Sequence, residues 1–424
     1  MAVNVFVLGL DDRNEETLLR LPDTDDVVFH PLLTIEELQV RDVIPVAELV
    51  ETAMHQLKAF EGTIDAIVGY WDFPVSCMLP ILCERFGLPS TSLESRLKCE
   101  HKYWSRIEQD KVLGDTVAFE LVDPFDDDAL AKLRLDFPFW LKPVKAFSSE
   151  LAYRVDDRDA FTGALASIRD GIDRIGDPFA WVLDQVDLPP EIAAAGAKSC
   201  LAEEVIRGHQ VTVEGYSLNG EVHVYGIVDT LYYPGSLSFQ RYEYPSRLPE
   251  PVLARMADAS VKVIRQVGVD RSTFNIEFFW DEDTDRIRLL EINTRHSQSH
   301  ALLFESVDGM ANHAFMVALA LGRPPPVLRG QGRARYAAKW FLRRFEDGVV
   351  TRCPDAAQVE ALQREVPGTT IDLLVGEGTR LAEMHDQDAY SYKLAHIFVE
   401  ADDRDELSTK YRACVDGLDF GFAA

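Results

Sequence analysis

The first 95 residues alternate short apolar runs with helix-like stretches. Val3–Leu8, Val27–His30 and Ala66–Gly69 are apolar throughout or nearly so, which is typical of strands buried on both faces. Cys77–Phe86 has the length and composition of a helix, and Gly87 follows it at a position where helices commonly end. Strands that alternate with helices in this way predict a small α/β domain with a parallel sheet.

After residue 96 the pattern changes and predicts antiparallel strands. Val211–Leu218 and Glu221–Val228 flank Asn219-Gly220, the dipeptide most typical of a two-residue hairpin turn. Symmetric pairing about this turn places Glu214 opposite Tyr225. We therefore expect an α+β arrangement for this part of the chain.

A second predicted hairpin gathers polar residues on one of its faces. Thr273–Trp280 and Arg286–Asn293 are joined by the polar turn Asp281–Asp285. Side chains alternate along a strand, so symmetric pairing about the turn brings four polar residues to one face. These are Glu277 opposite Glu291 and Asn275 opposite Asn293, with Phe279 and Leu289 extending the face toward the turn. The other face collects an apolar set for the core: Ile276, Phe278, Leu290 and Ile292.

The two facing glutamates indicate a metal site. Carboxylates directly across a strand pair repel each other and destabilise a sheet, and a divalent cation removes that cost. Glu277, Glu291 and Asn293 offer the hard oxygen ligands that Mg²⁺ takes. The alternative is a solvated hairpin face on an acidic protein, but the apolar opposite face and the paired asparagines favour the metal site. Arg295 would project to the same side, to pair with the carboxylates or to bind phosphate oxygens.

Five motifs, in this order along the chain, resemble the ATP-grasp ligases, in particular the L-amino acid ligases and the biotin-carboxylase-like members. The resemblance covers residues 96–322. The motifs are Lys102 in Cys-Glu-His-Lys-Tyr, Lys142 in Phe-Trp-Leu-Lys-Pro, the run Leu201–Gly208, Glu277 in Phe-Asn-Ile-Glu-Phe, and Leu-Leu-Glu-Ile-Asn-Thr-Arg, which ends at Arg295.

The resemblance implies a multidomain fold of mixed α/β and α+β class. It consists of a Rossmann-like parallel-sheet domain over residues 1–95 and an ATP-grasp domain with antiparallel sheets over residues 96–322. The latter divides into a small lid subdomain, about 136–206, and a larger subdomain, about 207–322. A proline-rich stretch, Arg323–Val327, then marks the boundary to a C-terminal α+β subdomain, 323–424.

The resemblance also implies roles for individual residues, with ATP and Mg²⁺ bound and Mn²⁺ able to substitute for Mg²⁺. Two departures from the family stand out. The loop 144–150 has no glycine over the phosphates, and Gln210 stands where the family has a ribose-binding glutamate. The implied nucleotide-binding residues are Lys102, Lys142, Ser148, Ser149, Glu203, Glu204, Val205, Ile206 and Gln210. The implied metal ligands are Glu277, Glu291 and Asn293, and Arg295 is catalytic. Because the chain leaves the site directly after Arg295, we also expect His296, Ser297 and His300 to contact the second substrate.

The resulting hypothesis is an ADP-forming ligase that joins a small carboxylate to an amine through an acyl phosphate, with residues 144–151 closing as a lid. Two alternatives remain open: a biotin-carboxylase-like carboxylation, and a nucleotide-binding protein without catalysis, which the glycine-free loop suggests. No GxGxxG after the first strand, GxxxxGK[ST], GxSxG or HExxH motif is present, so other nucleotide, hydrolase and zinc-protease sites lack support.

Charge and composition limit the kinds of molecule that this protein is expected to bind. The 424 residues include 71 acidic and 43 basic side chains, a net charge of −28, which argues against a nucleic-acid or anionic membrane surface. A few placed cations can still hold a small anionic substrate. The sequence has no transmembrane-length apolar run and no basic leader, and its six cysteines are scattered. We expect a cytoplasmic enzyme with reduced thiols, small-molecule substrates and, from base rates alone, a homodimer.

Overall fold

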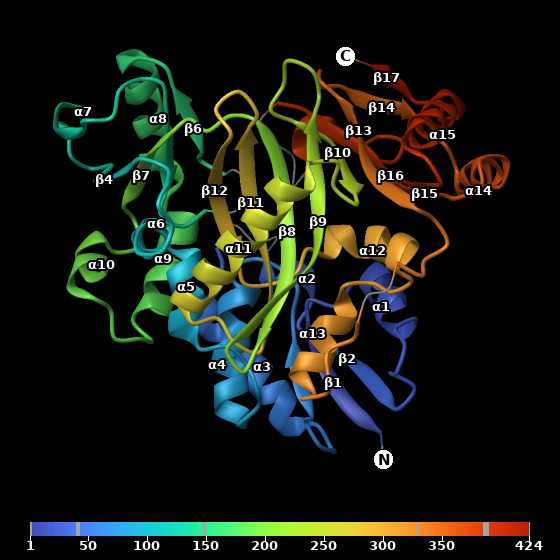
Figure 1. Cartoon of the computed structure of the whole chain (residues 1–424), viewed down its shortest axis with the longest axis horizontal. Coiled ribbons are helices and arrows are strands. Elements are labelled where there is room, and N and C mark those ends of the chain that lie inside the picture. Colours follow the sequence, from blue (N-terminus) through green and yellow to red (C-terminus); the bar gives the residue numbers. More distant parts are fainter. Residues whose placement is uncertain (1, 40–42, 147–149, 328–329, 385–389, 424) are drawn as a thin grey trace.

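Four sheets organise the computed structural model, which describes residues 2–39, 43–146, 150–327, 330–384 and 390–423 (Figure 1). A parallel sheet lies at the N-terminal end, a small antiparallel sheet forms one flank, and a long antiparallel sheet crosses the molecule. A two-stranded sheet lies near the C-terminus. This mixture of parallel and antiparallel sheets confirms the predicted fold class.

The N-terminal sheet is parallel, as predicted, with strand order β2-β1-β3. Its strands are β1 Val3–Leu8, β2 Val27–Leu32 and β3 Ala66–Val68, and its helices are α1 Asp12–Leu19, α2 Ile35–Leu38, α3 Val46–Ala59 and α4 Val75–Phe86. Gly87 ends α4 in the left-handed conformation, at φ +64°. One face of the sheet packs on α3 and α4, and the other packs on α1 and on α13 (His313–Ala320). A helix from late in the chain therefore completes the first domain's core.

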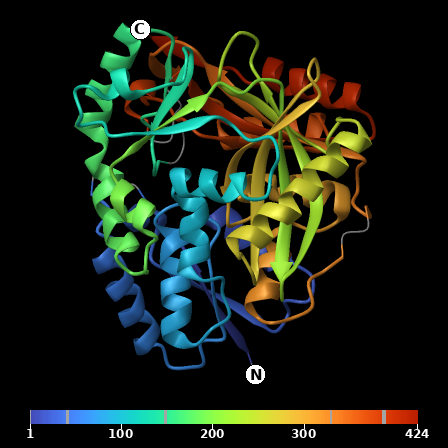
Figure 2. The same cartoon turned by 60° about the vertical axis from the view of Figure 1, so that its left-hand side comes forward.

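The flanking sheet is antiparallel, with strand order β4-β7-β5-β6. Two helices connect it to the first domain, α5 Leu93–Glu100 and α6 Lys102–Asp110. Its strands are β4 Phe119–Val122, β5 Phe139–Pro143, β6 Tyr153–Val155 and β7 Cys200–Glu204, and its helices are α7 Ala129–Lys132, α8 Arg158–Gly171, α9 Asp173–Leu183 and α10 Pro190–Ala195. Figure 2 brings this flank, drawn in green, to the front.

The long sheet has eight antiparallel strands in the order β12-β11-β8-β9-β10-β13-β16-β15. These are β8 His209–Leu218, β9 Glu221–Tyr232, β10 Phe239–Tyr244, β11 Ser272–Asp281, β12 Arg286–Asn293, β13 Tyr336–Arg344, β15 Thr369–Leu373 and β16 Tyr392–Ala401. Strands that follow residue 322 thus continue the sheet that begins before it. The division into domains at residues 95 and 322 stays a prediction.

Helices cover both faces of the long sheet. One face packs on α11 Glu250–Val267 and on the C-terminal helices α14 Ala356–Glu365 and α15 Arg404–Gly417. The opposite face contacts α12 Ala301–Asp308, which the short 3₁₀ helix η1, Gln298–His300, precedes. The remaining elements are β14 Val349–Arg352, paired with β17 Gly421–Ala423, and the 3₁₀ helix η2 Leu381–Glu383.

The register of the β11–β12 hairpin confirms the predicted pairing of Glu277 with Glu291, and the asparagines two residues away also pair as predicted. Beyond Glu277 a β-bulge shifts the register, so Phe278 pairs with Leu289. The prediction that Leu289 lies on the polar face was wrong for this reason. Leu289 is buried with Phe278 in the core, whereas Leu290, expected in the core, is only half-buried.

A second β-bulge makes the pairing in the β8–β9 hairpin differ from the predicted one. Glu214 pairs with Gly226 instead of Tyr225, because the register shifts by one residue after Gly215. The Tyr225 hydroxyl nevertheless donates a hydrogen bond to Glu214 at 2.7 Å. A β-carbon at position 226 would lie 2.4 Å from the Phe304 ring, so this point of the strand has room only for glycine.

Two further features concern the state of the cysteines and the length of the apolar helices. All six cysteines are free thiols, and five of them are buried. Within the described ranges, no helix combines the length and the apolar character that crossing a membrane requires.

Candidate active site

The facing glutamates of β11 and β12 have opposite ionisation tendencies. Burial, together with the charge of Glu291, raises the pKa of Glu277 to about 7. Burial also opposes ionisation of Glu291, but Lys102 donates a hydrogen bond to it at 2.5 Å and lowers its pKa to about 2. Near neutral pH, Glu291 is therefore ionised, while Glu277 holds a proton for part of the time.

Gln210 holds the protonatable glutamate in place. Its side-chain nitrogen Nε2 donates to Oε2 of Glu277 at 2.7 Å, and its carbonyl oxygen accepts from the Tyr232 hydroxyl. The role predicted for Gln210, a contact with ribose, stays a prediction. In this structure its amide orients Glu277, the carboxylate that carries the raised pKa.

The asparagine pair leaves an oxygen available for a metal. Asn293 donates from Nδ2 to Oδ1 of Asn275 at 3.0 Å, and Asn275 donates to the backbone carbonyl of Arg295 at 2.9 Å. Asn293 is thus fixed through its nitrogen, so its oxygen remains as the possible ligand beside Glu277 and Glu291.

This donor set fits Mg²⁺ better than a metal that needs a full protein cage. In the described part of the chain, no three or more His, Cys, Asp or Glu residues cluster as a metal site would require. Two carboxylates and one amide oxygen instead leave positions for water and for nucleotide phosphates, which is how Mg²⁺ is commonly held. Mn²⁺ accepts the same oxygen ligands.

Two lysines approach the carboxylates from different elements. Lys102, at the start of α6, also donates to the carbonyl of Ala146 at 3.2 Å and so links the loop after β5 to the metal face. Lys142, on β5, pairs with Glu203, which also accepts from the Arg106 guanidinium at 2.5 Å. The charge of Lys142 contributes to the low pKa of Glu291, so both predicted phosphate-binding lysines act on one site.

The predicted adenine contacts lie where β7 passes into β8. Glu203 is buried, and its carboxylate forms ion pairs with Lys142 and Arg106. A contact of Glu203 with adenine would therefore come through its backbone. Glu204 accepts from the backbone nitrogen of Ala118 at 3.3 Å, and Val205 and Ile206 are half-buried. All four assignments stay predictions. Ser148 and Ser149, predicted to bind phosphate, lie outside the described residues.

Arg295 forms a bidentate pair with Asp72. Its Nε and Nη2 donate to the two carboxylate oxygens at 2.8 and 2.7 Å. Its charge also favours the ionised form of Glu277 and so lowers the pKa of that carboxyl. The catalytic role of Arg295 stays a prediction. Asp72 is not among the site residues predicted from the sequence. The available signal was its position after buried parallel strand β3, where ligand-binding residues of α/β folds commonly lie.

The segment after Arg295 turns into the protein. Its first residue, His296, is buried: its backbone nitrogen donates to Thr273 Oγ1 at 3.0 Å, and its ring lies 4.6 Å from that of His313. His300 and the backbone nitrogen of Ser297 both bond to Glu214, at 2.7 and 3.1 Å. Substrate contacts of His296, Ser297 and His300 stay predictions. His300 and the backbone nitrogen of Ser297 already have a partner inside the protein, whereas Nε2 of His296 is buried without a hydrogen-bond partner among the described residues.

Comparison with known proteins bears on the site as a whole. Residues 135–301 match the model of the ATP-grasp domain. D-alanine–D-alanine ligase of Acidiphilium cryptum is 25% identical over 257 residues, which cover 59% of this chain and 71% of that ligase. The carbamoyl phosphate synthase large chain of Arthrobacter sp. is 41% identical over 68 residues, which are 16% of this chain but only 6% of that relative.

Solved structures share the fold over nearly the whole chain. L-amino acid ligase from Bacillus licheniformis aligns with a TM-score of 0.73 and 16% identity, covering 100% of this chain and 99% of that one. N5-carboxyaminoimidazole synthase from Aspergillus clavatus, solved with ADP, aligns with a TM-score of 0.68 and 17% identity, covering 98% of this chain and 98% of that one. Biotin carboxylase from Campylobacter jejuni aligns with a TM-score of 0.63 and 14% identity, covering 100% of this chain and 92% of that one. At these identities the likeness establishes the fold.

The raised pKa of Glu277 predicts a pH-dependent stability. With a folded pKa of about 7 against an ordinary 4.5, its ionisation favours the unfolded chain, so stability is lost as pH rises from about 4.5 to about 7. Glu277→Gln should remove this loss, making the variant increasingly stable relative to wild type across that range. Urea unfolding without metal at pH 5, 6, 7 and 8 measures it, with Glu282→Gln in the exposed turn as the control. Parallel pH profiles for wild type and Glu277→Gln would contradict the account.

Proposed function

The chain carries an ATP-grasp domain, and from this premise we propose that it is an ADP-forming ligase that joins a small carboxylate to an amine. The observation that carries the proposal is the Glu277–Glu291 pair, with Lys102 bonded to one of its members. Facing carboxylates and an adjacent lysine are the charges required to hold a magnesium-bound triphosphate. The fold shared with L-amino acid ligase supports the same reaction class.

Binding of nucleotide redistributes the charges already present. Glu277, in its ionised form, would hold Mg²⁺ together with Glu291 and Asn293, and the metal would supply positive charge beside the transferring phosphoryl group. Lys102 then exchanges part of its contact with Glu291 for phosphate oxygens, and Lys142 does the same from Glu203. Each lysine is held in advance by an acidic partner, so neither has to be ordered when the nucleotide arrives.

The chemistry of the ligation sets the order of the two steps. An ionised carboxylate is a poor electrophile, so the γ-phosphate is first transferred to its oxygen and ADP is formed. The amine then attacks the acyl carbon, the carbon–oxygen bond to phosphate breaks, and inorganic phosphate leaves. Arg295 stabilises the negative charge that develops on the phosphoryl group and on the tetrahedral adduct. Closure of residues 144–151 would exclude water from the acyl phosphate.

The products are predicted to be ADP and phosphate in equal amounts. A phosphate-release screen of carboxylates against amines, including pairs of amino acids, should find a pair that depends on both partners. Glu291→Gln should lose at least about 100-fold in turnover, because the metal and Lys102 both lose their ligand. Glu282→Gln, in the exposed turn of the same hairpin, should keep wild-type turnover.

Other products would identify a different activity. AMP and pyrophosphate as stoichiometric products would replace the acyl phosphate by an adenylate. Turnover that requires bicarbonate and biotin would identify a carboxylase. ATP binding without ADP formation under every substrate mixture would identify a nucleotide-binding protein without catalysis.

The role of Arg295 leads to a separate prediction. Arg295→Ala should lower kcat by roughly 10²- to 10³-fold, the usual loss of one preorganised donor to a developing charge, and change KM for ATP only modestly. Asp72→Asn keeps the arginine but weakens its anchor, so its loss should be smaller. Steady-state kinetics of both variants measure this. An increase confined to KM for ATP in Arg295→Ala would show that Arg295 binds nucleotide only.

A further inference from the structure

Lys339, on β13, is a buried lysine without an acidic partner. Its side chain is 4% exposed, and its ammonium donates to the Ser299 hydroxyl at 3.1 Å. Among the described residues, no carboxylate lies within ion-pair distance of it. Burial, followed by the charges of Arg13 and Lys393, lowers its pKa well below the usual lysine value, and Asp372 opposes this only in part. The other buried lysine, Lys145, does pair with a glutamate, Glu100.

Two aromatic rings lie beside this ammonium, and a buried nitrogen without a hydrogen-bond partner lies on the neighbouring strand. The centres of the Phe341 and Phe398 rings lie 5.2 and 5.3 Å from Nζ of Lys339. His396, on the neighbouring strand β16, lies 5.3 Å from the Phe341 ring, and its Nε2 is buried without a hydrogen-bond partner in the described structure. Two nitrogen groups on adjacent strands are therefore available to an incoming acceptor.

The Lys339 cluster lies on the sheet face that carries the metal ligands. Lys339 is opposite Tyr242 on β10, whose ring packs 4.7 Å from that of His300. Ser299, the partner of Lys339, is four residues after Arg295, so one short segment runs from the metal ligands to this lysine. From β13 to β11 is four strand spacings, roughly 19 Å between backbones, and side chains shorten this gap from both ends.

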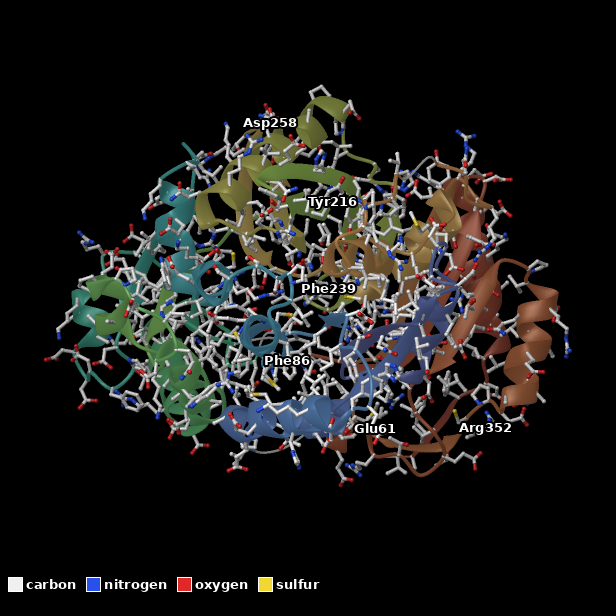
Figure 3. All side chains as sticks on the ribbon, turned by 90° about the horizontal axis from the view of Figure 1, so that it is seen from below. Glu61, Phe86, Tyr216, Phe239, Asp258 and Arg352 are labelled. Carbon is white, nitrogen blue, oxygen red and sulfur yellow. The ribbon has the colours of Figure 1, made fainter. Side chains whose placement is uncertain are left out.

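Aromatic side chains line this part of the sheet between the two groups. Phe239 lies 5.9 Å from Tyr242 and 6.5 Å from Phe341, measured between ring centres. Viewed from below, Phe239 lies near the middle of the outline, and Asp258 and Arg352 lie toward opposite sides (Figure 3). A substrate that spans from the metal ligands to Lys339 would therefore pass over an aromatic surface.

A buried ammonium without a counter-ion is costly, and an acidic neighbour is the usual remedy. This chain has 71 acidic residues and only 12 lysines, yet none of the acids in the described ranges lies within ion-pair distance of Lys339. We propose that Lys339, Ser299 and His396 form a subsite for a carboxylate that one of the two substrates carries and that is not phosphorylated. The proposal rests on the ligase function, because it names a property of a ligase substrate.

The composition of the subsite favours a carboxylate over a phosphate group. One ammonium, one hydroxyl and one imidazole supply donors for a small planar anion with a single charge. A phosphate dianion is usually met by several charges or by the fork of an arginine. Arg13, whose charge acts on Lys339, carries such a fork, but it pairs with Asp372 while its guanidinium stacks 4.3 Å from the centre of the Phe398 ring.

Thermal melting with saturating MgADP tests the proposal without requiring turnover. The probes are L-alanine, L-glutamate and succinate, each beside its amide, and inorganic phosphate. In the wild type, at least one carboxylate should raise the melting temperature more than its amide does. Lys339→Met should weaken that carboxylate about 10- to 100-fold in apparent Kd, the loss of a hydrogen bond to a charged group. Lys339→Arg should restore much of the binding, and Lys262→Met, on the surface of α11, should change nothing.

A structural role would give a different result. Removing an uncompensated buried amine should leave the melting temperature of Lys339→Met without ligand equal to or above that of wild type, whereas a structural lysine would lower it. If Lys339→Met folds poorly, Ser299→Ala should still weaken the same carboxylate several-fold.

Three results would overturn the proposal: equal carboxylate binding in wild type and Lys339→Met, no carboxylate that exceeds its amide, or a Lys339-dependent preference for phosphate. Failure of the ligase function itself is distinguishable. It would appear in the phosphate-release screen, as the absence of any ADP formation that depends on both a carboxylate and an amine, whatever the melting experiment gives.

Discussion

Two carboxylates face each other across the β11–β12 strand pair and repel each other. The groups around them are arranged so that this repulsion is offset. Lys102 neutralises Glu291, whereas Glu277 keeps a proton at a pKa of about 7 and is held by Gln210. A divalent cation bound to the nucleotide offsets the same repulsion. In its absence the pair is balanced by one proton and one lysine, so the site is preorganised for the cation at little cost.

The pair depends on packing between distant parts of the chain. α6 carries Lys102 from the flank, β3 leads to Asp72 in the first domain, and Asp72 holds Arg295 at the end of β12. Glu214, fully buried, fixes the segment after Arg295 through His300 and the backbone of Ser297, and it also accepts from Asn312 at 3.0 Å. These contacts hold the metal ligands of β11 and β12 and the start of the segment that carries Ser299, the hydrogen-bond partner of Lys339 on β13.

Local pattern predicted the elements and the central pairing. Alternation and turn chemistry are local properties, so the parallel strands of the first domain and the Glu277–Glu291 pairing could be derived from sequence. The bulges at Leu290 and Tyr225 could not, because they depend on how the sheet packs on its neighbours. Asp72 and Lys339 were missed for a related reason. Their importance arises from contacts between residues far apart in the sequence, because 223 residues separate Asp72 from Arg295 and 40 separate Lys339 from Ser299.

The most direct test of the central claim is whether the facing glutamates hold a nucleotide-bound divalent cation. Electron paramagnetic resonance of Mn²⁺, titrated into the protein with ADP, counts the metal bound per chain. The account predicts one or two sites in wild type, and loss of this binding when both Glu277 and Glu291 are replaced by glutamine. Equal Mn²⁺ binding by the wild type and the double variant would contradict it.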